Sequence, residues 1–263
     1  MEIELDLNKS VDANAAAYFE RAKEARKKVE GLNKYIAIAE KKVLENPPLK
    51  ESVKKSEKPR KWFEKFRWFF SSDNLLIIGG RDAQSNEQIV KNKMKKNDVY
   101  FHAEVFGAPH CVIVAPEELK GKEFSPPDSS LLEAATFAVT FSKAWEEARP
   151  IADAYSVKPE QVSKSTKSGE SMGTGAFMIY GERNWFKKTP LSCAVGYYPP
   201  LSRLMCAPFS AVKKNCRFVV ELRQGKKSKE EIAKEIKALF EKKGLVFSVD
   251  EIVSILPNGG FEL

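Results

Sequence analysis

The stretch that decides the fold runs from residue 98 to residue 115 and reads DVYFHAEVFGAPHCVIVA. Residues 98–105 alternate in polarity and residues 111–115 are apolar, and these patterns predict two strands. Gly107, Ala108 and Pro109 between them form a turn sequence. Strands that follow one another with no helix between them favour a mixed or antiparallel sheet over a doubly wound one.

The same succession of strands continues through the rest of the chain. Further strands are predicted at residues 152–157, 175–181, 191–198, 203–208 and 217–223. Helices are predicted at residues 82–94, from the spacing of Ile89, Val90 and Met94, and at 128–148 with Asp128 as its cap. Two more are predicted behind the capping boxes Ser228 with Glu231 and Ser248 with Glu251. The sequence therefore predicts an α+β fold, a mixed or antiparallel sheet with flanking helices.

The N-terminal part of the chain has a different pattern. Residues 3–7 (IELDL) predict a short strand, and the long helix that follows has apolar residues from Val11 to Val43 spaced alternately four and three apart. This spacing is typical of a coiled-coil seam, and Pro47-Pro48 ends the helix. Because the sequence holds no second heptad segment, the seam predicts a partner helix, from another molecule, from a second copy by self-association, or from an absent part of a longer protein.

These differences predict three parts of the chain. Residues 1–48 form the short strand and the coiled-coil arm. Residues 49–61 (LKESVKKSEKPRK) form a polar and basic linker, and residues 62–263 form the α+β domain.

The composition is that of a folded protein with an excess of basic side chains. Of the 263 residues 43% are hydrophobic and 30% are charged, and 44 Lys and Arg against 36 Asp and Glu give a net charge of +8. Residues 161–243 hold 17 basic and seven acidic side chains, so the excess is concentrated there. A basic surface of this kind binds phosphate backbones, and solvated lysines on surface helices are the alternative explanation.

Several classes of protein lose support from this sequence. The four cysteines have no zinc-ligand spacing and three lie in apolar runs, which predicts buried, reduced thiols in a cytoplasmic protein. No apolar run approaches the roughly 20 residues that cross a membrane. No P-loop, dinucleotide fingerprint or GxSxG elbow occurs, so no catalytic role, metal or cofactor is predicted. A nuclease that uses Asp98 and His102 with a divalent ion remains as an alternative.

Three polar side chains share one face of the predicted strand at 98–105. Period-two alternation places Asp98, Tyr100 and His102 on one face and the apolar residues between them on the other. If the apolar face meets the core, the three polar groups stand in a row on an open face. Such a row can stack a base on Tyr100 and hydrogen-bond a base edge or a ribose hydroxyl. A surface triplet that pairs only with its neighbours is the alternative.

Two glycine-rich segments carry further candidate contacts. Gly79-Gly80-Arg81-Asp82 lies between an apolar strand and a helix, where backbone amides can hold an anion, although Asp82 can equally serve only as a helix cap. Residues 169–175 (GESMGTG) permit either close approach to a ligand or a flexible hairpin. Basic and aromatic residues near this second segment form a mixture that suits RNA, with buried aromatics under a basic loop as the alternative: Lys164, Lys167, Tyr180, Arg183, Trp185, Phe186, Lys187 and Lys188.

Read together, three sequence blocks resemble a known family. They are residues 61–94 with the motif GGRDAQ, residues 98–114, and residues 155–186 with the motif SGESMGTG. In this order they resemble the RNA-binding (NFACT-R) domain of the NFACT proteins of ribosome-associated quality control. Residues 5–28 resemble the returning strand and helix of that family's coiled-coil hairpin, and residues 201–263 look more like archaeal members than eukaryotic ones.

The resemblance implies a function and a set of contact residues. A full-length member binds the large ribosomal subunit that still holds a stalled peptidyl-tRNA, and recruits charged tRNA so that the nascent chain is extended without a template. The expected partners are therefore tRNA and ribosomal RNA, and no membrane. Polar positions in and beside the matching blocks are expected to contact RNA: Arg81, Asp82, Gln84, Asn86, Asp98, Tyr100, His102, Gln161, Ser163, Lys164, Lys167, Glu170 and Arg183.

The sequence also departs from the family pattern. The family's D-x-aromatic-x-H signature commonly has Trp where this sequence has Tyr100, a smaller ring for stacking. The chain starts where the family has a large N-terminal domain and an outgoing coiled-coil helix, which indicates a piece of a longer protein or a reduced member. The alternative to an RNA-binding domain is a coiled-coil interaction module without its own RNA selectivity, which uses the seam from Val11 to Val43.

Overall fold

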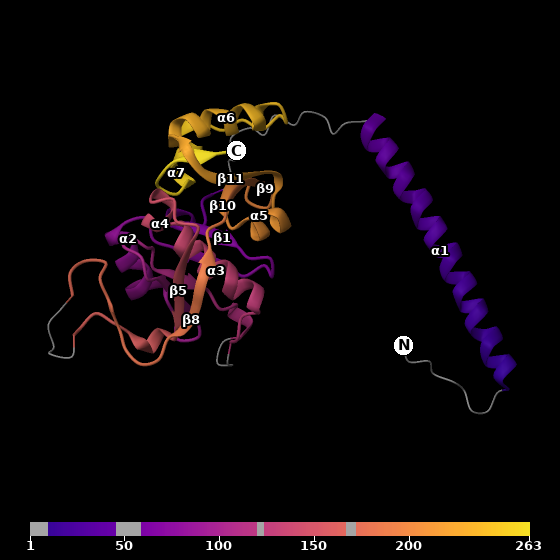
Figure 1. Cartoon of the computed structure of the whole chain (residues 1–263), viewed down its shortest axis with the longest axis horizontal. Coiled ribbons are helices and arrows are strands. Elements are labelled where there is room, and N and C mark those ends of the chain that lie inside the picture. Colours follow the sequence, from indigo (N-terminus) through magenta and orange to yellow (C-terminus); the bar gives the residue numbers. More distant parts are fainter. Residues whose placement is uncertain (1–9, 46–58, 120–123, 167–171) are drawn as a thin grey trace. The chain divides into compact units, whose positions relative to one another are not determined.

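The computed structural model describes residues 10–45, 59–119, 124–166 and 172–263, and side chains of the first range only as far as residue 30 (Figure 1). The chain divides into two compact units, Met1–Glu51 and Ser52–Leu263.

The first unit contains the long helix α1 (Val11–Glu45), and this helix prediction is confirmed. Ser10 begins it, because its hydroxyl accepts a hydrogen bond from the backbone N–H of Ala13 at 3.2 Å. Within the described side chains, apolar residues of the predicted seam stand open to solvent, Val11 at 82% and Val29 at 56%. Pairing of this seam stays a prediction. The predicted strand at 3–7, the stop at Pro47-Pro48 and most of the predicted linker at 49–61 lie outside the described residues.

The second unit is built on a six-stranded sheet in which every neighbouring pair is antiparallel, as predicted. Residues 98–115 contain the two central strands of this sheet, with Tyr100 opposite Val112. The strand order is β1 (Arg67–Phe70), β2 (Leu76–Gly79), β4 (Cys111–Ile113), β3 (Val99–Ala103), β5 (Ile151–Val157) and β8 (Asn184–Pro190). Strand β8 therefore forms one edge of the sheet.

A second, four-stranded sheet carries the C-terminal helices. Its order is β10 (Arg203–Ala207), β9 (Cys193–Tyr198), β11 (Arg217–Lys227) and β12 (Phe261–Glu262). The accompanying helices are α5 (Phe209–Asn215), α6 (Lys229–Glu241) and α7 (Val249–Ile255), and Figure 1 shows α6 and α7 beside β11. Both predicted capping boxes are confirmed, because Ser228 and Ser248 each exchange hydrogen bonds with the residue three positions on.

The helix predicted at 128–148 is two helices, α3 (Asp128–Thr140) and α4 (Lys143–Glu146). The break occurs at Ser142, whose extended backbone lets its hydroxyl cap α4 by accepting from the N–H of Ala144 at 3.1 Å. Helix α3 is buried along most of its length. Its Glu133 accepts a hydrogen bond from the backbone N–H of Ser72 at 2.8 Å and another from the Ser210 hydroxyl at 2.6 Å. These bonds join α3 to the segment that follows β1 of the first sheet and to helix α5 beside the second sheet.

The six-stranded sheet has a core on each face. One core holds α3 and the second sheet, and Phe101 of β3 points into it. The other core is closed by the short helix η1 (Trp62–Lys65) and by one turn of π-helix, η2 (Ile89–Lys93), which follows helix α2 (Ala83–Gln88). Tyr100 points into this core. Strands β6 (Val162–Ser163) and β7 (Met178–Ile179) form a separate two-stranded sheet. Two single helical turns, η3 (Glu117–Leu119) and η4 (Pro159–Gln161), complete the fold. Strand β3 is therefore covered on both sides.

Candidate nucleic-acid interface

The prediction that one face of β3 is open is wrong, because the core that contains Tyr100 covers this face. Tyr100 is fully buried, and its hydroxyl lies 2.7 Å from Nδ1 of His110. Alternation shows which side chains share a face of a strand, but not whether another element packs on that face. A base cannot stack on the ring of Tyr100 in this structure, so the ring and its hydroxyl hold His110 in place.

Asp98 at the start of this row is also buried, 3% exposed. Its two carboxylate oxygens accept hydrogen bonds from the backbone N–H groups of Lys95 at 2.7 Å and Ala115 at 2.9 Å. Burial raises the pKa of Asp98, and these two hydrogen bonds act against that rise. Asp98 thus fixes two loops against the start of β3, and it forms part of a cavity wall.

The two histidines of the chain form a tilted pair with ring centroids 4.7 Å apart. His102 Nδ1 lies 3.2 Å from the carbonyl oxygen of Pro109, so this nitrogen carries the proton and donates. Burial lowers the pKa of His102 and lowers that of His110 to about 3. Both imidazoles are therefore neutral at pH 7. A neutral imidazole has one nitrogen that accepts a hydrogen bond, and Nδ1 of His110 can accept from the Tyr100 hydroxyl.

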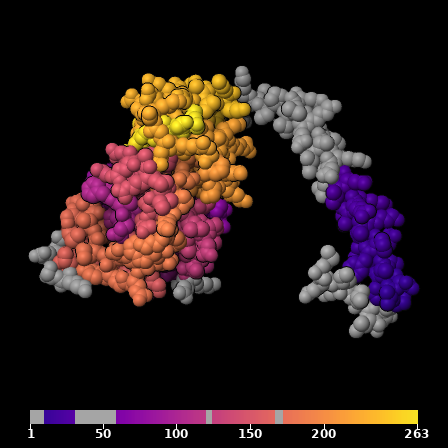
Figure 2. Space-filling model, viewed as in Figure 1, coloured from indigo at the N-terminus to yellow at the C-terminus, as the bar shows by residue number. Residues whose placement is uncertain are grey.

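A row of rings continues from His102 across two further strands to the edge of the sheet. His102 stands opposite Tyr155, and Tyr155 stands opposite Trp185 of the edge strand β8. The ring centroids are 6.1 Å apart in the first pair and 5.3 Å in the second, both edge-to-face. Tyr155 is buried, whereas Trp185 is 38% exposed. The row thus ends in an accessible tryptophan, and Figure 2 shows the orange part of the chain that includes β8 on the outer surface.

Two cations flank this tryptophan. The guanidinium carbon of Arg183 lies 4.5 Å from the ring centroid of Tyr155 and 5.5 Å from that of Trp185, and Lys187 Nζ lies 3.7 Å from the centroid of Trp185. Arg183 also pairs with Glu104 at 3.3 Å, and Lys187 with Asp153 at 2.9 Å. Ion pairs this exposed contribute little stability, so both cations can exchange their carboxylates for a phosphate at small cost.

The GGRDAQ motif supports the fold of this region. Arg81 donates to the carbonyl oxygens of Lys65 at 3.3 Å, Phe66 at 3.1 Å and Ser254 at 2.7 Å. The interpretation of Asp82 as an N-cap is confirmed, since its carboxylate accepts from the N–H of Ser85 at 2.7 Å.

Gln84 of this motif and Asn86 just after it have different surroundings. The side-chain oxygen of Asn86 accepts from the backbone N–H of His110 at 3.0 Å, whereas Gln84 is exposed. A contact between RNA and Gln84 stays a prediction.

A carboxylate of α2 binds the described parts of the β6–β7 hairpin, residues 162–166 and 172–179. Glu87 accepts from Lys164 at 2.6 Å, from Lys91 at 2.7 Å and from the N–H of Gly175 at 2.7 Å. These donors hold the pKa of Glu87 at about 2. Gly175 has φ of +74° and packs so closely on Ala83 that a Cβ would lie 2.7 Å from backbone atoms. Here the glycine serves a close approach within the protein.

Other predicted contact residues of this hairpin are engaged in its structure. Lys164 also donates to the carbonyl oxygens of Gly173 and Ala176, at 2.7 and 3.3 Å. Gln161 donates to the carbonyl oxygens of Tyr180 and Glu182. Ser163 accepts from the backbone of Ser165, while the predicted contacts Lys167 and Glu170 lie outside the described residues. RNA contacts by these residues stay predictions.

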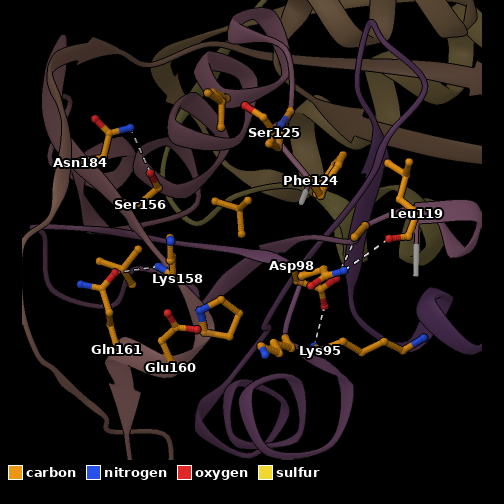
Figure 3. Close-up of a pocket in the computed structure, with 18 of the residues that line it drawn as sticks. Lys95, Asp98, Leu119, Phe124, Ser125, Ser156, Lys158, Glu160, Gln161 and Asn184 are labelled. Atoms are coloured by element: carbon orange, nitrogen blue, oxygen red, sulfur yellow. Dashed lines mark hydrogen bonds between the residues drawn. The ribbon is translucent and has the colours of Figure 1, made fainter. Parts of the chain in front are cut away.

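Two cavities open beside this hairpin and share one wall. The larger, about 830 Å³, lies between β3, β5 and the turns before and after them, with Asp98, Asn184 and Ser125 around it (Figure 3). The smaller, about 450 Å³, has an apolar lining and four lysines: Lys91, Lys95, Lys96 and Lys164. The two cavities have four lining residues in common: Lys95, Lys96, Pro159 and Glu160.

Sequence reasoning missed several residues of this surface. No motif contains Lys95, Lys96 or Asn184, and the sequence indicated Tyr155 only as part of a strand. The available signal was the KK pair at the end of an apolar helical pattern. Within the described ranges, no cluster of three or more His, Cys, Asp or Glu side chains could hold a metal ion, and no helix has the length and apolar character of a membrane span.

Residues 65–181 match the family described as the NFACT protein RNA binding domain, so the second unit contains an RNA-binding domain of this class. The chain is 39% identical over 212 residues to the archaeal Rqc2 homolog aRqcH of Methanocaldococcus jannaschii. This alignment covers 80% of this chain and 30% of that protein. It is 44% identical over 179 residues to the human ribosome quality control complex subunit NEMF, 66% of this chain and 16% of that one. The chain belongs to the NFACT family, as the sequence blocks predicted, and spans less than a third of these relatives.

Proposed function

We propose that this chain binds unpaired RNA at the β8 edge of its sheet. The observation that carries the proposal is the exposed ring of Trp185 between Arg183 and Lys187. An aromatic face accepts any base, and cations beside it take the phosphates, which is how sheet surfaces hold single strands. The match to an RNA-binding domain supports the same class of ligand.

The predicted contact residues then divide by role. Arg183, beside Trp185, and the exposed Gln84 are the proposed RNA contacts, and His102 begins the row of rings that ends at Trp185. Arg81, Asp82, Asn86, Asp98 and Tyr100 are positioning residues, because each hydrogen-bonds within the protein. Gln161, Ser163 and Lys164 shape the hairpin that borders the surface.

The whole protein's role is proposed from its relatives. Proteins named as ribosome quality control complex subunits match this chain in human, fruit fly and fission yeast. We infer that the chain acts in the same process in the cytoplasm, on the large ribosomal subunit with its stalled peptidyl-tRNA. Recruitment of tRNA for template-independent tailing is the finer form of the proposal, and it assigns no catalytic step or cofactor to this chain.

The experiment measures binding of a fluorescein-labelled 12-nucleotide oligouridylate to the full chain by anisotropy. Trp185→Ala is expected to weaken binding by about fivefold or more, since base stacking contributes about 1–3 kcal/mol per base. Trp185→Phe should retain most of the affinity. The matched control is Trp62→Ala, which removes another exposed tryptophan that has a lysine, Lys93, over its ring. Equal losses for Trp62→Ala and Trp185→Ala would refute the placement of the site.

A second candidate function rests on α1. Described seam residues stand exposed along it, Val11, Tyr18 and Val29 among them. An apolar seam in water favours pairing with another helix, so α1 can serve as a coiled-coil interaction segment. Sedimentation equilibrium over a hundredfold range of concentration tests self-association, and a monomer at all concentrations would exclude a second copy as the partner.

A further inference from the structure

The two cavities beside the hairpin differ in charge. The smaller is lined by Lys91, Lys95, Lys96 and Lys164 against one acid, Glu160. The larger is lined by three lysines and four acids, namely Lys95, Lys96, Lys158, Asp98, Glu117, Glu160 and Glu182. A phosphate is therefore attracted to the shared lysine wall, and it is repelled from the interior of the larger cavity.

The shared wall is available to a ligand. Lys95 and Lys96 are exposed. The ion pair of Lys95 with Glu117 is long, 3.6 Å, and both side chains are more than 60% exposed, so it holds Lys95 weakly. By contrast, Lys164 and Lys91 are held by Glu87. Among the described lysines of the two cavities, Lys95 and Lys96 are the two that line both cavities and are exposed, so they can meet a phosphate that lies between them.

The cavity interiors suit bases. Val90, Met94, Val162 and Phe177 make an apolar lining in the smaller cavity. In the larger, Val99, Leu131, Val157 and Phe124 provide apolar walls, and Asn97, Asn184 and Ser125 add groups that can meet a base edge. Cavities with mostly apolar walls and a few polar groups are the usual sites for flat heterocycles.

We propose that Lys95 and Lys96 hold the phosphate between two consecutive unpaired nucleotides, with one base in each cavity. Because the cavities share this wall, a single phosphodiester link crosses it. The π-helical turn η2 ends just before the lysine pair, and Asp98 fixes the loop behind it through the N–H of Lys95. This subsite rests on the proposed RNA binding, and it extends the bound strand beyond the β8 edge.

The test of the phosphate seat compares two double variants of equal charge. Lys95→Ala with Lys96→Ala removes the wall, and Lys242→Ala with Lys243→Ala removes an exposed lysine pair at the end of α6. With the labelled oligouridylate, the first double variant should bind about tenfold more weakly. It should also lower the slope of log affinity against log salt by about 0.7, the value for one phosphate contact on a single strand. The control pair should change the affinity by less than about twofold.

The test of the base site fills the larger cavity from its rim. Ser125 is exposed and lines this cavity, so Ser125→Trp places a ring in it, whereas Ser125→Ala leaves it open. Ser125→Trp should weaken binding by about fivefold with an unchanged salt slope, and Ser125→Ala should bind as the unsubstituted protein does. Urea unfolding of each variant verifies that the domain is folded.

The outcomes separate the two proposals. If the unsubstituted chain binds no RNA, both fall. If it binds and Trp185→Ala weakens binding, but the Lys95/Lys96 variant equals the Lys242/Lys243 control, the subsite is refuted and RNA binding at β8 stands. Equal binding by Ser125→Trp and Ser125→Ala likewise overturns the base position in the larger cavity.

Discussion

His110 should make the stability of this protein depend on pH in a range where few other groups titrate. Burial holds its folded pKa at about 3, whereas an unfolded histidine has a pKa of about 6.5. The unfolded chain therefore takes up a proton that the folded chain refuses as the pH falls below about 6.5. The stabilisation is complete above that pH, is lost progressively as the pH falls, and levels off near pH 3.

The size of the effect at pH 5 depends almost entirely on the unfolded pKa. At pH 5 the folded imidazole is still neutral, because this pH lies well above its folded pKa of about 3. The linkage relation gives a loss of about 2 kcal/mol between pH 7.5 and pH 5 from His110 alone. His102, whose pKa is also lowered by burial, adds in the same direction. Carboxylates with lowered pKa, such as Glu87, titrate mainly below this interval.

The assay is urea unfolding at pH 7.5 and pH 5.0, followed by tryptophan fluorescence. His110→Gln keeps an acceptor for the Tyr100 hydroxyl but cannot titrate, so the loss of stability between the two pH values should shrink by about 2 kcal/mol. A substituted protein that loses as much as the unsubstituted one would refute the buried neutral imidazole. If His110→Gln does not fold, ¹⁵N shifts of the ring nitrogens decide directly, and a protonated His110 at pH 5 gives the same refutation.

Three further substitutions test other contacts. Gly79→Ala places a Cβ 2.8 Å from Cε1 of Phe137 and 3.1 Å from Sγ of Cys111, so urea unfolding should show a loss of about 1–3 kcal/mol. Ser228→Ala removes the α6 cap and should cost about 1 kcal/mol in the same assay, whereas Ser228→Gly should cost only a few tenths. Glu87→Gln should speed amide exchange in residues 172–180 at pH 7, and the unsubstituted protein should show the same change only as the pH falls from about 4.5 towards 2. Unchanged exchange in Glu87→Gln would show that the hairpin has another anchor.

The sequence predicted the elements whose signal is local. Alternation located β3 and the apolar run located β4, and two capping boxes marked the starts of α6 and α7. The edge strand β8 was missed because its residues NWFKKTP are mostly polar, as an edge strand in water allows. The helix break at Ser142 was missed because the apolar pattern continues past it.

The candidate site was less accessible to sequence reasoning, since it depends on which elements cover each other. The sequence indicated Tyr100 as an aromatic residue on a strand and Trp185 only as one of several aromatic residues among basic ones. In the structure Tyr100 is fully buried, whereas Trp185 lies on the sheet edge. Arg81 and Lys164 were expected to contact RNA because they are polar positions in the sequence blocks that resemble the family. The bonds of Arg81 to Ser254 and of Lys164 to Glu87 become visible only when segments far apart in the sequence are brought together.

The bonds of Arg81 also determine how this protein can be dissected. The family match ends at residue 181, but Arg81 donates to Ser254, and Arg67 of β1 donates to Leu256 at 3.4 Å. A fragment cut at the end of the match would lose these acceptors and strip the second sheet from α3, whose buried side chains would meet water. The minimal folding unit therefore reaches at least to residue 256. An isolated 65–181 fragment would also lack Arg183, Trp185 and Lys187 of the β8 edge, so its failure to bind RNA would not argue against a site there.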